Sequence, residues 1–149
     1  MRRFDWKSDI IRRVLSAKGL TMRQHPEQIL HEWMDAVNTG NVPNLTALYD
    51  PSAVLIPTFS SRLLKTPEMI EDYFIRLGSR EELSVALHEK TVISQTLGDQ
   101  IYALSGIYCW RFAIDGELLN FEARFNYMLD LKKTSPIMHH HSSQIPRVI

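Results

Sequence analysis

The segment LNFEARFNYMLDL, residues 119–131, alternates with a period of two between apolar and mostly polar side chains. Successive side chains of a β-strand point to opposite faces, so this pattern predicts a strand with one apolar face. The apolar positions are Leu119, Phe121, Ala123, Phe125, Tyr127, Leu129 and Leu131. This face needs burial, either in the core of the chain or against a partner subunit, and in the second case Phe121, Phe125 and Tyr127 form a dimer contact.

The remaining segments predict an α+β fold of one domain, residues 25–149. Helices are predicted in PEQILHEWMDAVNTG (26–40), in NVPNLTALYDP (41–51) and in TPEMIEDYFIRLG (66–78), with a short strand in AVLIP (53–57). After Gly78, runs of β-branched and aromatic residues separated by Gly98-Asp99 and Asp115-Gly116 predict strands near 84–94, 100–112, 118–131 and 136–143. Helices followed by an antiparallel meander define the α+β class.

A basic arm, residues 1–24, precedes this domain. Residues 1–23 hold seven Lys and Arg against two Asp, whereas the remaining residues carry a formal charge of −5. Trp6, Ile10 and Val14 recur at helical spacing, which predicts an amphipathic helix. Such a helix could be a targeting presequence, lie on a membrane surface or pack on its own acidic domain.

Composition excludes several classes of protein. The single Cys109 cannot form an intramolecular disulfide, and no apolar run reaches the length of a membrane span. A basic face extending over the whole domain is also missing, which argues against a nucleic-acid partner. We therefore expect a cytoplasmic protein without stable membrane insertion.

Arg124 and Glu122 share the polar face of the alternating strand, roughly 7 Å apart. If they neutralise each other they are structural; if the guanidinium keeps donors free, it can grip an anionic ligand. His139 and His141 share a strand face, with His140 opposite. Two imidazoles could ligate a metal or act as acid and base, but no motif supplies a third ligand, so we expect neither a metal nor another cofactor.

Five segments, taken together, carry a family resemblance: the helix ending in NTG, LTALYDPSAVLIPTFSSRLLKTPEMIEDYF, GDQIYALSGIYCWRF, EARFNYML and HHHSSQIP. Over about residues 25–146 the chain resembles the calcium/calmodulin-dependent protein kinase II association-domain family, within the larger group similar to nuclear transport factor 2 and the SnoaL-like cyclases. The resemblance implies a cone-like fold in which N-terminal helices pack in a curved antiparallel sheet that leaves an open-ended pocket. It also implies self-association as a homodimer or higher oligomer.

By the same resemblance, Arg124 in EARF lines the pocket, where it can meet small carboxylates. The family's second pocket arginine falls near Gly106 here, which is a departure from the pattern. The tryptophan normally found before the last strand is also missing from LKKTSPIMHHH.

Two functions are therefore expected from the sequence. The first is a homo-oligomerising domain that binds a small anionic or apolar ligand; the alternative is a cofactor-independent isomerase, dehydratase or cyclase acting on a small carbonyl or carboxylate substrate. In the second case His139 or His141 would serve as base and Arg124 as anion stabiliser. The candidate pocket residues are Arg124, Glu122, His139, His141, Tyr73, Tyr108 and Trp110.

Overall fold

Helices come first in the part of the chain that the computed structural model describes, residues 23–149. Except for Arg23 and Gln24, the predicted basic arm lies outside the described residues. Helix α2 spans Pro26–Asn38, α3 spans Val42–Ala47 and α4 spans Pro67–Gly78. All three helices have proline in the first turn, where the missing N–H has no partner to lose.

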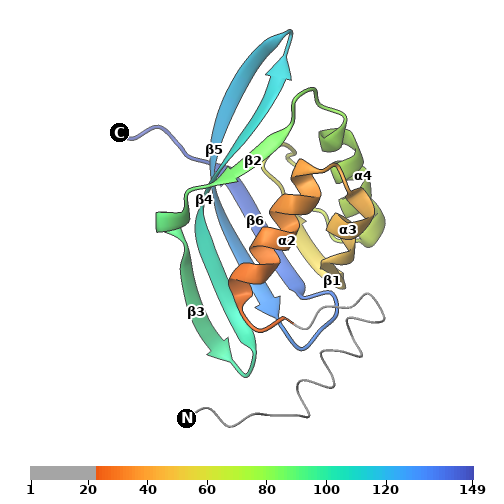
Figure 1. Cartoon of the computed structure of the whole chain (residues 1–149), viewed down its shortest axis with the longest axis vertical. Helices are drawn as coiled ribbons and strands as arrows, with labels where there is room; N and C mark the ends of the chain where they lie inside the picture. The colour runs from red at the N-terminus through yellow and green to blue at the C-terminus, as the bar shows by residue number, and fades with distance from the viewer. Residues whose placement is uncertain (1–22) are drawn as a thin grey trace.

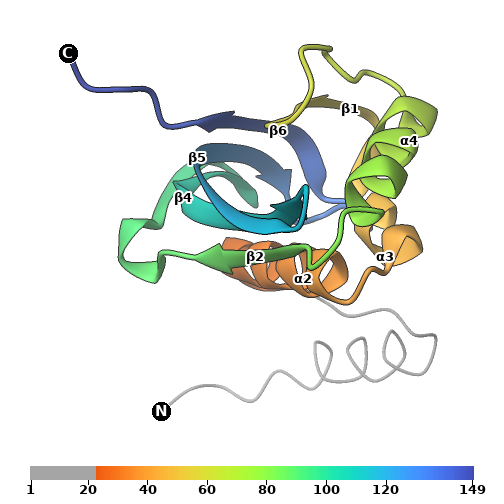
Figure 2. The same ribbon diagram turned by 90° about the horizontal axis from the view of Figure 1, so that it is seen from above.

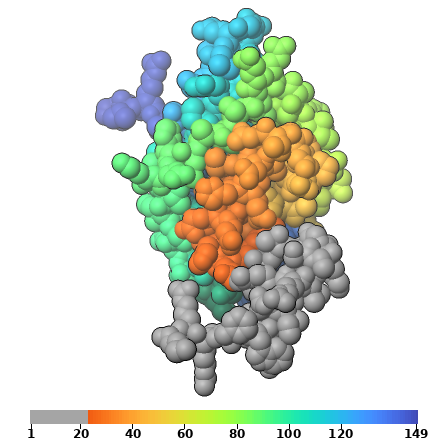
Figure 3. Space-filling view, in the orientation of Figure 1, coloured from red at the N-terminus to blue at the C-terminus, as the bar shows by residue number. Residues whose placement is uncertain are grey.

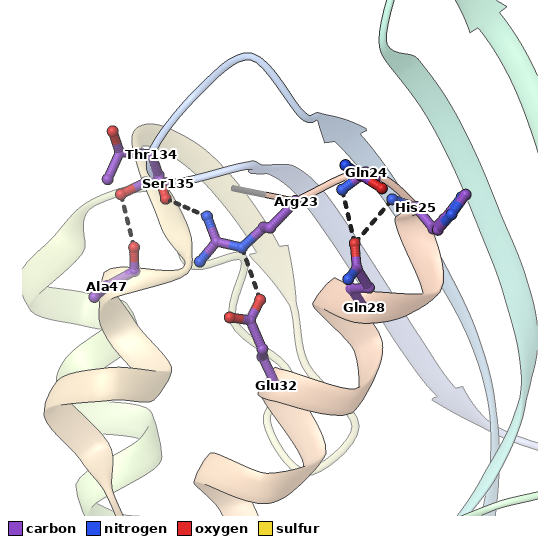
Figure 4. A network of polar contacts seen from close by, with 8 residues as sticks. All are labelled: Arg23, Gln24, His25, Gln28, Glu32, Ala47, Thr134 and Ser135. Atoms are coloured by element: carbon purple, nitrogen blue, oxygen red, sulfur yellow. Dashed lines mark hydrogen bonds and ion pairs between the residues drawn. The ribbon is translucent and has the colours of Figure 1, made fainter. Parts of the chain in front are cut away.

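A side chain accepts hydrogen bonds from backbone N–H groups at the start of each helix. The side chain of Gln28 accepts hydrogen bonds from the backbone N–H groups of Gln24 and His25, at 2.7 and 2.9 Å (Figure 4). Asn41 accepts from the N–H of Asn44, and Thr66 from that of Met69. These bonds satisfy backbone donors that have no partner within the first turn of a helix.

Six strands form one curved sheet: β1 Tyr49–Ile56, β2 Ser84–Leu87, β3 Ile93–Gly98, β4 Ile101–Ile114, β5 Glu117–Asp130 and β6 Ile137–Gln144. Their order is β1-β6-β5-β4-β2, and β3 pairs with the other half of β4. The pairs are antiparallel except for β1 with β6, which is parallel. The predicted turn between β4 and β5 is present, with positive φ at both Asp115 and Gly116.

Two boundaries differ from the prediction. The predicted strand 84–94 is divided by a 3-10 turn, Glu89–Thr91, into β2 and β3. The second helix ends at Ala47, and β1 begins at Tyr49 and includes Pro51. Proline is tolerated there because β1 lies at the edge of the sheet, where not every N–H needs a partner strand.

The sheet curves around α2, while α3 and α4 lie beside the β1 edge (Figures 1 and 2). The solvent-facing sides of α2 and α3 are exposed next to each other on one face of the molecule (Figure 3). This arrangement is the α+β cone that the sequence predicts. It encloses one apolar core between α2 and the concave face of the sheet.

The apolar face of β5 belongs to that core. Phe125 and Tyr127 are each 1% exposed, and the Tyr127 ring meets the Trp33 ring edge to face at 6.0 Å. Phe121 is half-buried and stacks on Phe112. Phe125 and Tyr127 therefore cannot form the predicted dimer contact without opening the core, and Phe121 is partly covered by Phe59 and Phe112 of the same chain.

Candidate functional site

A continuous chain of hydrogen bonds crosses the interior of the cone, and we call its members Trp33, Tyr49, His140 and Tyr108 the interior chain. The Nε1 of Trp33 lies 2.9 Å from the Tyr49 hydroxyl, which lies 2.8 Å from Nδ1 of His140. The other ring nitrogen, Nε2, lies 3.2 Å from the Tyr108 hydroxyl. All four side chains are buried, with His140 only 2% exposed.

The directions of these bonds follow from the donors that each group carries. Trp33 can only donate, so the Tyr49 oxygen accepts from it and the Tyr49 proton is left to donate to Nδ1 of His140. A neutral His140 then carries its proton on Nε2 and donates to Tyr108. The basic lone pair of this histidine is therefore engaged by Tyr49.

Burial sets the protonation state of the interior chain. Desolvation lowers the pKa of His140 well below its ordinary value, and the neighbouring His139 and His141 lower it further. Desolvation also raises the pKa values of Tyr49, Tyr108 and Tyr127. The interior is thus a neutral, polar environment at physiological pH.

Two buried polar atoms next to the interior chain have no partner among the described residues. They are the indole Nε1 of Trp110 and the hydroxyl of Tyr127, whose ring stacks on His140 with centroids 3.9 Å apart. Thr58 and Ser142 contribute one further polar contact through their hydroxyl groups. An unpaired buried donor is costly, so these two atoms mark the interior positions where a polar group could be accommodated.

A cavity of about 430 Å³ lies between α4 and the loop that joins β1 to α4, and we call it the mouth cavity. Its apolar wall is made by Phe59, Leu64, Met69, Tyr73 and Leu77. The Tyr73 hydroxyl accepts a hydrogen bond from the Phe59 N–H at 3.4 Å. The Phe59 ring in turn contacts the Trp110 ring, with centroids 5.8 Å apart, so Phe59 separates the mouth cavity from Trp110.

Three arginines line the rim of the mouth cavity: Arg62, Arg76 and Arg80. Arg76 is paired with Asp72, 3.1 Å from Nε to Oδ2. Within residues 23–149, neither Arg62 nor Arg80 forms an ion pair, although Arg80 lies over the Phe112 ring. Two carboxylates, Glu68 and Asp72, line the same cavity, so Arg62 and Arg80 are its two guanidinium groups without an ion pair among the described residues that could meet an anion.

The structure separates the predicted pocket residues into two groups. Tyr73 lines the mouth cavity, and Tyr108 and Trp110 lie in the interior beside it. The other four, Glu122, Arg124, His139 and His141, lie on the opposite, convex face of the sheet, which we call the outer face. The prediction that Arg124 lines the pocket is corrected: Arg124 is exposed, because it alternates with the buried Phe125.

Glu122 and Arg124, which share the outer face, do not form an ion pair with each other. Glu122 instead contacts His88, with 2.7 Å between Oε2 and Nε2, and both side chains are about half exposed. No group of three or more His, Cys, Asp or Glu side chains in the described region is placed to hold a metal ion.

A bulge in β6 decides which histidine faces inward. Leu129 pairs with Ile137 but Met128 pairs with His139, so one extra residue on β6 shifts the alternation. His140 therefore points inward opposite Tyr127, and His139 and His141 point outward. A strict period of two from the buried Ile137 would have given the reverse, which is why sequence reasoning missed His140.

Gly106 also departs from the family pattern for a physical reason. A Cβ atom built at this position would lie 2.7 Å from Cζ of Phe125. The Phe125 ring therefore occupies the space that a side chain at position 106 would need. An arginine cannot stand there without displacing the core.

The fold and this interior place the chain among the cone-shaped α+β proteins with a cystatin-like or nuclear-transport-factor-2-like fold. The model of the calcium/calmodulin dependent protein kinase II association domain matches residues 23–146, and the chain belongs to this family. No curated protein matches the chain in sequence.

Solved structures agree with this assignment. A candidate calcium/calmodulin-dependent protein kinase II association domain from Xanthomonas campestris is 27% identical, with a TM-score of 0.71 over 80% of this chain and 85% of that one. An NTF2-like protein from Novosphingobium aromaticivorans is 9% identical, with a TM-score of 0.67 over 99% and 94%. A ketosteroid isomerase-like protein from Erwinia carotovora atroseptica is 10% identical, with a TM-score of 0.65 over 81% and 94%. The last two show a shared fold alone.

None of the helices in residues 23–149 is long and apolar enough to cross a membrane.

Proposed function

We propose that the chain is a homo-oligomerising domain that associates through the outer face of its sheet and binds a small carboxylate in the mouth cavity. The observation that carries the first part is a small group of exposed apolar side chains on the otherwise polar outer face. Ile93 on β3 pairs with Ser105 and is 61% exposed, Met128 on β5 pairs with Ala103 and is 37% exposed, and Leu97 in the bulge of β3 is 53% exposed. Exposed large apolar side chains gathered on one sheet face are typical of a protein–protein contact.

The neighbouring outer-face residues support the same contact. Met128 pairs with Ala103 on β4 and with His139 on β6. Ala103 has a small side chain, and that of His139 is half-buried. Antiparallel partners directly opposite each other share a face. Met128 is therefore flanked on the outer face by side chains that leave it accessible to a partner.

The oligomerisation test is the mass of two variants measured by sedimentation equilibrium. Met128→Asp places a charge at the centre of the outer face and should shift the mass toward the 17.3 kDa monomer. Leu63→Asp is the matched control, because Leu63 is 60% exposed in the loop that joins β1 to α4. If both variants keep the wild-type mass, the outer face is not the contact.

The second part rests on the mouth cavity. Its apolar wall can receive a small ring or alkyl group, while Arg62 and Arg80 can meet a carboxylate at the rim. Calorimetry with phenylacetate and its neutral counterpart phenylacetamide tests this binding. Phenylacetate should bind more tightly than phenylacetamide, and both Arg62→Ala and Arg80→Ala should weaken the binding of phenylacetate.

The matched control is Arg124→Ala, which removes an exposed guanidinium from the outer face. Under the proposal it leaves phenylacetate binding unchanged. Equal losses in all three arginine variants would mean that the anion responds to overall charge and not to the mouth cavity.

The alternative, cofactor-independent catalysis, requires a base whose lone pair is free. The interior histidine, His140, has Tyr49 on Nδ1 and Tyr108 on Nε2. It can act as a base only after Tyr49 gives up its hydrogen bond. The geometry therefore supports association and binding better than catalysis.

A further inference from the structure

A groove of about 520 Å³ lies between α3 and α4, next to the start of β1. We call it the α3–α4 groove. Its lining is mostly apolar, with Val42, Pro43 and Ala47 on one wall and Ile70 and Ile75 on the other. Ile75 is 52% exposed, which leaves a large apolar side chain unpartnered in the described part of the chain.

The charges that line the α3–α4 groove are acidic. Glu71 and Asp50 line it, and none of its lining residues is basic. Asp50 stays ionised, because hydrogen bonds from Ser52 and the nearby Lys133 ammonium lower its pKa to about 2. Glu71 is exposed on α4. Asp50 is already paired with Lys133, at 3.0 Å between Oδ2 and Nζ, so the exposed Glu71 is the groove's acidic group that can attract a cationic apolar segment.

Such a segment is present in the same chain. Residues 1–22 carry six Lys and Arg against two Asp, a formal charge of +4, whereas residues 23–149 carry −4. The apolar side chains of Trp6, Ile10 and Val14 recur at the spacing of one helical face, with Arg12 and Arg13 beside them. Charge and apolar pattern both complement the α3–α4 groove.

The arm also joins the domain next to the groove. The Arg23 guanidinium donates to Glu32 at 2.7 Å and to the carbonyl of Thr134 at 2.9 Å. The adjacent Ser135 donates to the carbonyl of Ala47 at 2.7 Å, and Ala47 lines the groove (Figure 4). Residue 23, where the described chain begins, therefore lies close to the C-terminal end of α3, which lines the groove.

The length of the arm suits this position. Residues 16–22 can span up to about 23 Å when extended, and residues 1–15 would form a helix of about 22 Å. Helix α4, which makes one wall, has 12 residues and thus a length of about 18 Å. We propose that residues 1–15 dock in the α3–α4 groove of their own chain, with the apolar stripe on Ile75 and the basic residues toward Glu71.

Crosslinking in the full chain tests the proposal. In a Cys109→Ser background, Ile10→Cys is combined with Ile75→Cys and treated with a short bismaleimide. The matched pair combines Ile10→Cys with Leu118→Cys, an exposed position on the β4–β5 hairpin, which projects past α4 at the top of Figure 1. Docking predicts an intramolecular product at least about tenfold more abundant for position 75 than for position 118.

Two results would overturn the proposal. Equal yields for the two pairs would show that the arm does not prefer the α3–α4 groove. A product at dimer mass would show that the groove receives a second copy of the chain. Ile75 and Leu118 are 52% and 45% exposed, so cysteine at either position should not unfold the domain, and circular dichroism checks this.

A second readout uses the basic residues of the arm as protease sites. Docking should protect the bonds after Arg12 and Arg13 from trypsin. Ile75→Glu should then speed cleavage by about tenfold, while Leu118→Glu should leave it unchanged. Equal cleavage in the wild type and in Ile75→Glu would contradict docking.

Discussion

The interior chain makes a specific prediction about two tyrosines that differ only in their partners. Tyr49 accepts from Trp33 and donates to His140, whereas the Tyr127 hydroxyl has no partner in the described structure. Both side chains are buried in the same core and both contact the His140 ring. Tyr→Phe substitution therefore removes a hydrogen-bonded hydroxyl at position 49 and an unpartnered hydroxyl at position 127.

Tyr49→Phe leaves the Trp33 N–H and the Nδ1 lone pair of His140 without partners. Each buried group that loses its only hydrogen bond costs about 1 to 3 kcal/mol, so the free energy of unfolding should fall by about 2 to 5 kcal/mol. Tyr127→Phe removes a hydroxyl that is already unsatisfied. It should leave stability unchanged or raise it slightly, because an unpaired polar atom leaves the core.

Urea unfolding followed by tryptophan fluorescence measures both variants. Protein concentration must be equal throughout, since self-association would otherwise alter the apparent stability. The expected result is a clearly lower midpoint for Tyr49→Phe alone. Similar losses in both variants would refute the assignment of the interior chain, because they would show that Tyr127 also has a partner.

Three further predictions follow from the same core. His140→Gln should lower the free energy of unfolding at pH 7.5 and make it depend less on pH. The pKa of His140 is lowered in the folded state, so the neutral imidazole contributes its full stability above about pH 6.5. Below that pH the contribution is lost at about 1.4 kcal/mol per pH unit. Gly106→Ala should destabilise the fold by about 1 to 3 kcal/mol because the added Cβ meets Phe125, whereas Gly78→Ala, with nothing within 4 Å, should not. Phe125→Asp should unfold the protein, whereas Arg124→Asp should leave circular dichroism unchanged.

Each of these has a result that contradicts it. An unchanged pH slope in His140→Gln would mean that another group carries the acid sensitivity; His139, whose pKa burial also lowers, is present in both proteins and cancels in the comparison. Equal unfolding midpoints for the two glycine variants would show that the Phe125 ring can move aside. A folded monomeric Phe125→Asp would restore the dimer contact on the apolar face.

Local patterns predict the fold well because each element has its own signal. The alternation in 119–131 predicts β5, and proline and capping residues predict the starts of the helices. The family resemblance predicts how these elements are arranged. What the alternation cannot supply is a direction in space, because it says which residues share a face and not what covers that face.

The candidate site was less predictable for two physical reasons. The bulge at Met138 reverses the orientation of the following histidines, and it is produced by pairing with β5 and not by a local signal. The interior chain joins residues 107 positions apart, from Trp33 to His140, through tertiary packing. Only the presence of polar side chains in otherwise apolar segments, such as Tyr49 after Leu48, could have pointed to it.

Sedimentation velocity of the wild-type protein over a wide concentration range measures whether this association-domain chain assembles with itself. We expect a species at two or more times 17.3 kDa, which dissociates on dilution or persists throughout. A single 17.3 kDa species at every concentration would contradict it.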